Sequence, residues 1–450
     1  MYMVNLCKKY CREGVNILFC ALLFLLPWQT RWIARQGIIN GNHSEFLTVS
    51  VYGTDLLLLF LIAVKLFENN YKFQIKNFKS ISNIKFLKLN KFIILSLFFI
   101  VWNALSIFWA SDKILAVQHV AWLLLGTGLA WLVVTYEDKM KLIFCFAGGL
   151  MMSAWLGVWQ FFAQYAFANK WLGLAAHNVA EPGTSYLEIL DANHQAVRWL
   201  RTYGSFDHPN IFGLAMALGI ILVFWLIYNG NNVKFKNAFL YLALASFSAG
   251  LYASLSRSAL LGVALGLGII LFRTGFSKVK TPLAVSLFVI GALALFYSGP
   301  LLSRSNVSAR LEQKSLNERM VYLGQGVEMI KKHTFLGVGA GNYIKELEKE
   351  DQSKPAWAYQ PVHNFFLQVW AELGILAMLC VVMSFVMLGM YAWKRGAFQF
   401  AIFISVFPSM MVDHWLWSLH FGLLFFGFIF GITLGDSNTR IGHPNDSNVY

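Results

Sequence analysis

The chain has 450 residues, of which 58% are hydrophobic and only 13% are charged, and its formal net charge is +14 at pH 7. Soluble chains carry about a quarter charged residues, so this composition excludes an ordinary soluble enzyme. The basic residues are spread over short segments, which disfavours a nucleic-acid-binding protein, and the five cysteines indicate neither a disulfide framework nor a zinc site.

Apolar runs near twenty residues long recur along the chain, and each can cross a hydrocarbon core of about 30 Å. They are continuous rather than alternating, which argues against a β-barrel. The first run lacks a signal-peptide cleavage site and is expected to remain as a span. We predict an all-α, polytopic membrane protein with about twelve spans, beginning near residues 14, 54, 92, 114, 140, 209, 238, 258, 282, 363, 398 and 418.

Lysine and arginine residues predict the orientation of these spans. With the N-terminus inside, the inner segments hold most of the basic residues, including the lysine run Lys65–Lys91, which is expected to lie against an anionic inner leaflet. The short outer loops hold few. The predicted organisation is nine spans in 1–299, a large outer loop in 300–362, three spans in 363–435 and a cytoplasmic tail in 436–450.

Polar residues gather first on the outer face at 191–210, a segment that ends Arg-Thr-Tyr-Gly-Ser-Phe-Asp-His-Pro-Asn. Pro209 suits the first turn of the span that follows. Asp207 and Asn210 fit either a capped loop or a functional site. Arg201 lies close to a span and therefore needs a partner.

A second polar island, at 253–259, places Arg257 at the outer membrane boundary. A snorkelling surface arginine is one interpretation. The small serine and alanine residues around it favour close helix packing instead, and hence a functional arginine.

The third polar island is the long loop. Apolar residues at spacings of three and four predict a helix from an N-cap at Asn317 to about His333. A glycine-rich turn follows without a P-loop lysine, so it is expected to fold the loop back as a cap rather than to bind a nucleotide. A short helix is predicted at Tyr343–Glu350. Arg319 could be solvated or could face a cleft.

The long loop re-enters the membrane at His363, and histidine is the side chain that most readily exchanges protons near neutral pH. Arg201 and Arg257 are predicted on the same face. Arginine binds phosphate through paired hydrogen bonds, and a histidine beside it can accept a hydroxyl proton. The three residues suit a substrate with a phosphate head and a lipid tail. His119, His414 and His420 are expected to be packed, although a substrate contact at the Asp413–His414 turn stays open.

Five motifs in this order resemble the O-antigen ligase family, the superfamily of WaaL-type ligases and Wzy-type polymerases. They cover Arg201 to Gly374, and each is weak alone. The motifs are Arg-x-x-Gly-x-Phe-x-His-Pro-Asn at 201–210, Ser-Arg-Ser at 256–258, Glu-Arg at 318–319, His-x-x-Leu-Gly-x-Gly-x-Gly-Asn at 333–342 and His-Asn-x-x-Leu-Gln-x-x-x-Glu-Leu-Gly at 363–374.

The resemblance implies a GT-C-like membrane glycosyltransferase of the bacterial inner membrane. Such an enzyme transfers a glycan from an undecaprenyl-diphosphate-linked donor to an acceptor glycolipid or glycan on the outer face, by inversion and with no cofactor or metal. The sequence agrees, since no Asp-x-Asp motif or acidic outer cluster suits Mg²⁺. By resemblance the roles are catalysis by His363, diphosphate binding by Arg201 and Arg257, and further substrate contacts by Arg319, Asn364, His208 and Asn210.

The resemblance leaves the acceptor open. An O-antigen ligase that uses lipid A-core is the leading interpretation, with a polysaccharide polymerase and a protein O-oligosaccharyltransferase as alternatives. A secondary transporter is the alternative of another class. It predicts internal repeats and polar residues at the bilayer midplane, whereas the polar residues of this chain gather at one face.

Overall fold

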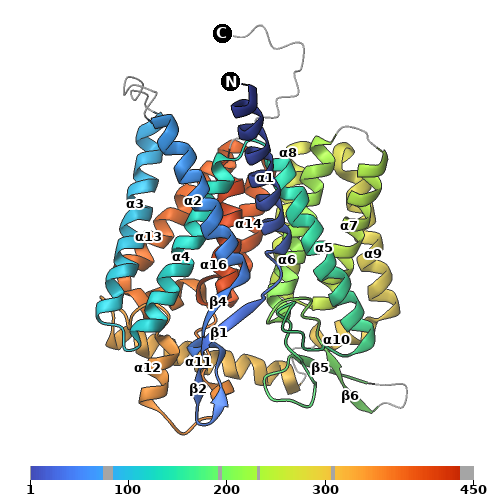
Figure 1. The fold of residues 1–450 in the computed structure, drawn as a ribbon. Helices are drawn as coiled ribbons and strands as arrows, with labels where there is room; N and C mark the ends of the chain where they lie inside the picture. Colours follow the sequence, from blue (N-terminus) through green and yellow to red (C-terminus); the bar gives the residue numbers. More distant parts are fainter. Residues whose placement is uncertain (1, 74–84, 191–194, 231–233, 306–309, 436–450) are drawn as a thin grey trace.

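The computed structural model describes residues 2–73, 85–190, 195–230, 234–305 and 310–435. In this part of the chain, long helices form a bundle whose one end is covered by short helices and three two-stranded sheets (Figure 1). Helix α1 begins at the opposite end, and α16 ends there. The predicted cytoplasmic tail, 436–450, lies outside the described residues, as does much of the lysine-rich inner segment.

The all-α polytopic fold class is confirmed, and each of the twelve predicted starts lies in or next to a helix of the bundle. Seven of the described helices are at least 18 residues long and apolar enough to cross a membrane, and α1, α14 and α16 contain shorter apolar stretches. The bundle helices are α1 (Tyr2–Leu25), α2 (Gly53–Phe73), α3 (Lys85–Leu105), α4 (Lys113–Thr135), α5 (Lys139–Ala163), α6 (Pro209–Asn229), α7 (Lys234–Ser254), α8 (Arg257–Thr274), α9 (Phe276–Phe296), α13 (Phe365–Arg395), α14 (Ala397–Val412) and α16 (His420–Leu434).

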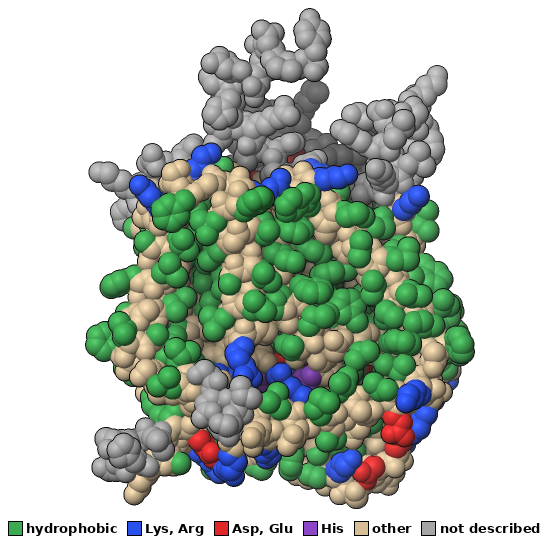
Figure 2. All heavy atoms as spheres, turned by 180° about the vertical axis from the view of Figure 1, so that it is seen from behind, with side chains coloured by type: hydrophobic (Ala, Val, Ile, Leu, Met, Phe, Trp, Pro, Cys, Tyr) green, Lys and Arg blue, Asp and Glu red, His purple; other side chains and the backbone are tan. Residues whose placement is uncertain are grey.

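The outer surface of the bundle is apolar. Figure 2 shows hydrophobic side chains covering the middle of one face, with charged side chains toward both ends. On α9, Leu295 and Phe296 are 82% and 83% exposed. Water would penalise such a surface, whereas a hydrocarbon core would not. The central helix α6 is instead almost wholly buried. The chain is therefore a multi-pass membrane protein.

The predicted long loop forms a folded cap of helices α10 (Ser298–Ser305), α11 (Arg310–Lys332) and α12 (Tyr343–Glu350), with a 3₁₀ turn at Ala356–Ala358. The predicted short helix at Tyr343–Glu350 is confirmed. The predicted N-cap at Asn317 is wrong, because α11 begins at Arg310. The first two turns of α11 have few apolar residues and are held by ion pairs of Arg310 and Glu312, which an apolar periodicity cannot reveal.

Six short strands at the capped end were not predicted from the sequence. They pair antiparallel as β1 with β4, β2 with β3, and β5 with β6. The β5–β6 hairpin packs on α10 and α11, where Ser303 Oγ donates to Glu188 O at 2.6 Å and Arg310 pairs with the Glu188 carboxylate. The strands are β1 (Arg31–Arg35), β2 (Ile38–Ile39), β3 (Asn42–His43), β4 (Val49–Tyr52), β5 (Tyr186–Leu190) and β6 (Ala196–Leu200).

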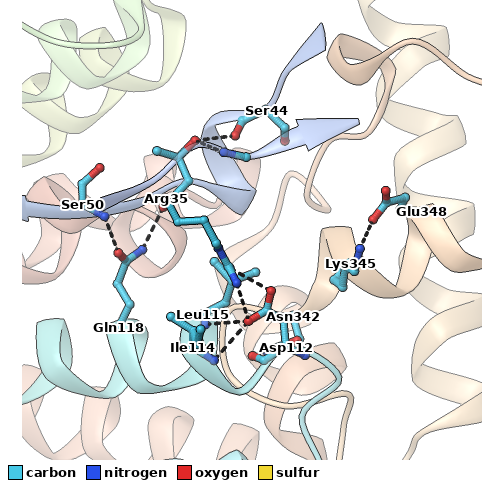
Figure 3. A network of polar contacts seen from close by, with 12 residues as sticks. Arg35, Ser44, Ser50, Asp112, Ile114, Leu115, Gln118, Asn342, Lys345 and Glu348 are labelled. Carbon is cyan, nitrogen blue, oxygen red and sulfur yellow. Dashed lines mark hydrogen bonds and ion pairs between the residues drawn. The ribbon is translucent and has the colours of Figure 1, made fainter. Parts of the chain in front are cut away.

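A polar network joins the β1–β4 hairpin, the start of α4 and the turn before α12 (Figure 3). Asp112 caps α4, since its carboxylate accepts from two backbone N–H groups of the first turn, and it forms an ion pair with Arg35 at 2.7 Å. The backbone N–H of Asp112 donates to Asn342 Oδ1 at 2.7 Å. Three segments far apart in the sequence are thereby fixed together.

The glycine-rich turn between α11 and α12 packs on a break in α13. At this break Gly374 has φ +79°, and a Cβ there would lie 1.9 Å from the Phe335 carbonyl oxygen. Gly337 also has positive φ and no space for a Cβ. The N–H of Val338 donates to Ala371 O at 3.0 Å. The cap is thus anchored on the helix that follows His363.

Candidate functional site

Four chain segments meet at the capped end of the bundle. They are the end of β6 with Arg201, the α7–α8 turn with Arg257, the loop before α13 with His363, and the turn after α14 with Asp413. Figure 2 shows a hollow where the apolar band meets this end, and basic and histidine side chains gather in it. The helix directions explain this arrangement, because α6, α8 and α13 all begin at this end.

Arg201 is only 4% exposed and is held by several partners. Its Nε and Nη2 donate to Ser254 O at 3.0 and 2.9 Å, Nη2 also donates to Asn210 Oδ1 at 2.9 Å, and Nη1 donates to Ser185 Oγ at 3.1 Å. A guanidinium has five N–H donors, so little of it is left for a ligand. Burial, and then the charge of Arg304, lower the pKa of Arg201 to about 9. Arg201 is therefore positively charged at neutral pH, and the hydrogen-bond partners described for it are all uncharged groups.

Asn210 connects Arg201 to an aspartate on another helix. Its Nδ2 donates to Asp413 Oδ2 at 3.0 Å, and the other oxygen of this carboxylate lies 3.8 Å from His363 Nδ1. The Nδ1 atom is buried and makes no hydrogen bond with the described residues. A series of hydrogen bonds thus runs from Arg201 through Asn210 to Asp413 and ends beside the imidazole of His363. A small movement would bring His363 Nδ1 and Asp413 Oδ1 within hydrogen-bond distance.

Two further histidines surround Asp413. His414 Nδ1 contacts Ser418 Oγ at 2.5 Å, and its ring centroid lies 5.2 Å from that of His363. His208 Nδ1 accepts from the Asn210 backbone N–H and so caps α6. Burial lowers the pKa of both His208 and His414 to about 3, so both are neutral at neutral pH.

Asp413 is 6% exposed, yet its pKa lies well below the ordinary range. Burial alone would raise it. The interactions with His363, His414 and His208 outweigh burial and lower it. The negative charge of Asp413, 3.8 Å from His363 Nδ1, would attract the positive charge that this imidazole carries after it accepts a proton.

Arg257 and Arg319 are more accessible than Arg201. The Arg257 side chain is 45% exposed, and its Nη2 donates to Glu312 Oε2 at 2.9 Å. Arg319 is half-buried on α11 and makes no hydrogen bond or ion pair with the residues that the structure describes. Tyr322, also on α11, lies with its ring centroid 5.7 Å from that of His363. The helix α11 therefore covers the site.

Asn364 has a local structural task. Its Oδ1 accepts from the Leu367 N–H and caps α13, while its Nδ2 donates to Met411 O at 3.1 Å, near the end of α14. Asn364 therefore fixes His363 relative to the turn that carries Asp413. The substrate contacts predicted for Asn364, His208 and Asn210 stay predictions.

The side chains of His363, Asp413 and His414 each offer one ligand atom, and these atoms lie within 4.8 Å of one another. Two imidazoles and a carboxylate can bind a transition metal. Their positions equally suit a proton acceptor and its orienting carboxylate, so the predicted absence of a metal stays a prediction.

A separate cavity of about 40 Å³ is lined by His119, Asp207, Glu372 and Ser418 among others. Both ring nitrogens of His119 lack a hydrogen-bond partner within the described residues. The cavity has room for a few water molecules but not for a sugar.

Sequence reasoning gave too little weight to Asp413 and did not find Glu312 or Arg304. The signal for Asp413 was an acidic residue next to a histidine in a short turn between two apolar helices. Glu312 and Arg304 give no such signal, because they lie in a polar loop where charged residues are ordinary.

Comparisons with known proteins relate the middle of the chain to one family. The Wzy_C family model, described as O-antigen ligase, matches residues 240–382. This range contains Arg257, Arg319 and His363 but excludes Arg201 and Asp413. A curated protein, the teichuronic acid biosynthesis protein TuaE of Bacillus subtilis (strain 168), is 23% identical over 300 residues. The match covers 63% of this chain and 56% of TuaE, so about half of that protein is represented.

The resemblance of the sequence motifs to the O-antigen ligase family is thereby confirmed for the middle of the chain. Several helices of this region are long and apolar enough to cross a membrane. The chain is a multi-pass membrane protein whose residues 240–382 match the O-antigen ligase family model.

Proposed function

We propose that this protein is a membrane glycosyltransferase of polysaccharide biosynthesis, which transfers a glycan from an undecaprenyl-diphosphate-linked donor to an acceptor hydroxyl. The observation that carries the proposal is the hydrogen-bonded chain Arg201–Asn210–Asp413, which ends beside the imidazole of His363. It couples the guanidinium of Arg201, whose positive charge suits a phosphate nearby, to a group that can accept a proton. Both lie where the apolar surface ends, which is the level of a lipid headgroup.

The proposed reaction is a single displacement at the anomeric carbon. The acceptor oxygen forms a bond to this carbon while the bond to the diphosphate oxygen breaks, and the bonding electron pair leaves with the diphosphate. The acceptor proton passes to His363 Nε2, and Asp413 stabilises the imidazolium from the Nδ1 side. Such a displacement inverts the anomeric configuration and needs no metal, since arginine side chains stabilise the leaving diphosphate.

The arginines have different parts in this proposal. Arg257 and Arg319 have unused donors and contact the diphosphate directly. Arg201 contributes mainly its charge and its one remaining Nη1 proton, because its other donors are bound by the protein. Asn210, His208 and Asn364 hold the surrounding helix ends in place and border the acceptor. The cap helix α11 helps to exclude water.

An O-antigen ligase, with lipid A-core as acceptor, is the first candidate for the specific reaction, because the matching family model carries that description. A polysaccharide polymerase is the second, because the similar protein is named for teichuronic acid biosynthesis. In both cases we propose a bacterial inner membrane location with both termini in the cytoplasm and the capped end outside, since the short loops on the opposite side hold more lysine and arginine residues than the short loops at the capped end.

The test uses the full-length protein in lipid nanodiscs with an undecaprenyl-diphosphate-linked glycan and one acceptor at a time. Glycan transfer to lipid A-core would identify a ligase, extension of a second lipid-linked glycan a polymerase, and transfer to a protein an oligosaccharyltransferase. Movement of an unchanged lipid-linked glycan across the bilayer, without transfer to any acceptor, would contradict the proposal and favour a transporter.

A further inference from the structure

A buried carboxylate on the cap helix binds two arginines of the site. Glu312, in the first turn of α11, is 3% exposed. Its Oε2 accepts from Arg257 Nη2 at 2.9 Å, and its Oε1 forms an ion pair with Arg304 of α10. Three helices, α8, α10 and α11, are thereby joined through one side chain.

Arg304 extends this contact to the backbone that precedes Arg257. Its Nε donates to Leu255 O at 3.2 Å. Leu255 has φ +50°, a conformation that costs energy for a residue other than glycine. Its neighbour Ser254 presents its own carbonyl to Arg201. Two arginines therefore hold the turn from which Arg257 projects.

The charges at this position do not cancel. Four arginines lie close enough for their charges to interact, and one carboxylate, that of Glu312, lies among them and pairs with two of the four. The arginines are Arg201, Arg257, Arg304 and Arg319. Burial, followed by the competing effects of Glu312 and Arg257, lowers the pKa of Arg304. The net positive charge suits a ligand with more than one negative charge, such as a diphosphate.

The geometry at Arg257 distinguishes two possible parts for Glu312. A carboxylate that competed with substrate would cover the guanidinium. Instead Glu312 accepts from Nη2 alone, and the side chain of Arg257 stays 45% exposed. Its Nε and Nη1 make no hydrogen bond with the residues that the structure describes. Glu312 therefore holds the Nη2 edge of the Arg257 guanidinium and leaves the Nε and Nη1 donors available to a ligand.

We propose that Glu312 is a positioning residue of the anion site, and that its carboxylate, braced by Arg304, orients Arg257 so that the free edge of the guanidinium faces a lipid diphosphate. The inference rests on the proposed function and adds to it a contact from the cap. A diphosphate bound to Arg257 would also hold α11 over the site, because Glu312 belongs to that helix.

The experiment measures the dissociation constant of undecaprenyl diphosphate for the full-length protein in nanodiscs, with undecaprenyl monophosphate as the comparison ligand. The variants are Glu312→Gln, Arg257→Ala and the double variant. Glu328→Gln is the matched control, because Glu328 is an exposed carboxylate on the same helix that pairs with Lys332. We expect Glu312→Gln to weaken diphosphate binding about tenfold and the control to leave it unchanged. In the Arg257→Ala background, Glu312→Gln should cost less than about twofold, since residues that act through each other are not additive.

Two outcomes would overturn the inference. Tighter diphosphate binding by Glu312→Gln would show that Glu312 competes with the diphosphate for Arg257. Full additivity of the losses in binding caused by Glu312→Gln and Arg257→Ala would show that Glu312 acts on the structure independently of Arg257. If Glu312→Gln does not fold, Glu312→Asp provides the same comparison, since it keeps the charge but withdraws it from Arg257 by one methylene. Failure of the wild-type protein to bind the diphosphate, or full binding by Arg257→Ala, would instead count against the proposed function.

Discussion

Replacement of Asp413 by asparagine should remove most of the turnover while leaving the donor site intact. In the wild-type protein an imidazole that donates Nδ1–H toward Asp413 keeps a lone pair on Nε2 for the acceptor proton. Asparagine can still accept from Asn210 Nδ2 through its oxygen, but its amide NH₂ then replaces Oδ1, so it faces His363 Nδ1 and also opposes the His414 backbone N–H that Oδ1 accepts. That arrangement favours the tautomer with the proton on Nε2, which cannot act as a base.

The expected magnitude follows from the distance. Opposite charges about 4 Å apart near a protein surface attract by about 4 kcal/mol, and His363 Nδ1 lies 3.8 Å from Asp413 Oδ1. This is an upper limit, because the His363 side chain is 23% exposed. General base catalysis as a whole contributes about 10²–10⁴-fold. We therefore expect Asp413→Asn to lower turnover about 10²–10³-fold, and to change the donor KM by less than about threefold.

The assay follows release of undecaprenyl diphosphate, which reports turnover whichever acceptor is used. The matched control is Asp351→Asn in the cap, where the carboxylate is 39% exposed and pairs with Lys354. In a His363→Ala background, Asp413→Asn should have little further effect. Turnover within threefold of wild type, or an equally large loss in the His363→Ala background, would refute the coupling of Asp413 to His363.

Four other predictions follow from the structure. Arg319→Ala should raise the donor KM several-fold at unchanged thermal stability, since Arg319 has no described partner; an unchanged KM would remove it from the site. Gly374→Ala should lower the thermal midpoint markedly or abolish folding, because the added Cβ would lie 1.9 Å from the Phe335 carbonyl oxygen; a thermal midpoint like that of wild type would show that this contact relaxes. Desolvation, followed by the charge of Glu45, raises the pKa of Asp207 to about 6 although the residue is exposed. The native state then binds more protons than the unfolded state between about pH 4 and 6, so stability should fall as pH rises through this window, but only slightly, because water screens an exposed carboxylate; Asp207→Asn should flatten the dependence, measured as thermal midpoint against pH. Treatment with a chelator should leave undecaprenyl diphosphate release unchanged, whereas a loss that a divalent cation restores would assign the two imidazoles and the carboxylate to a metal.

The helical framework could be predicted because the membrane imposes simple requirements. Every span needs a long apolar run, so each of the twelve predicted starts falls in or next to a bundle helix. The basic residues predicted which loops share a face. These two signals bring Arg201, Arg257 and His363 to the same end of the bundle, where the structure also places them.

The contacts between these residues could not be predicted, because they depend on how the helices pack. Asp413 is joined to Asn210 across 203 positions of sequence. Its position beside His363 follows from the packing of the end of α14 near the start of α13. The buried ion pair of Glu312 with Arg257 likewise depends on the fold of the cap. The short strands were missed because their residues neither alternate clearly nor form a common core.

Arg257 and His363 are proposed to act together on a lipid-diphosphate-linked glycan. The most direct measurement is undecaprenyl diphosphate release coupled to glycan transfer by the reconstituted wild-type, His363→Ala and Arg257→Ala proteins, all confirmed as folded. We expect transfer by the wild type, a loss of about 10²-fold or more in turnover for His363→Ala, and a raised donor KM for Arg257→Ala. Full transfer by both variants would contradict this proposal.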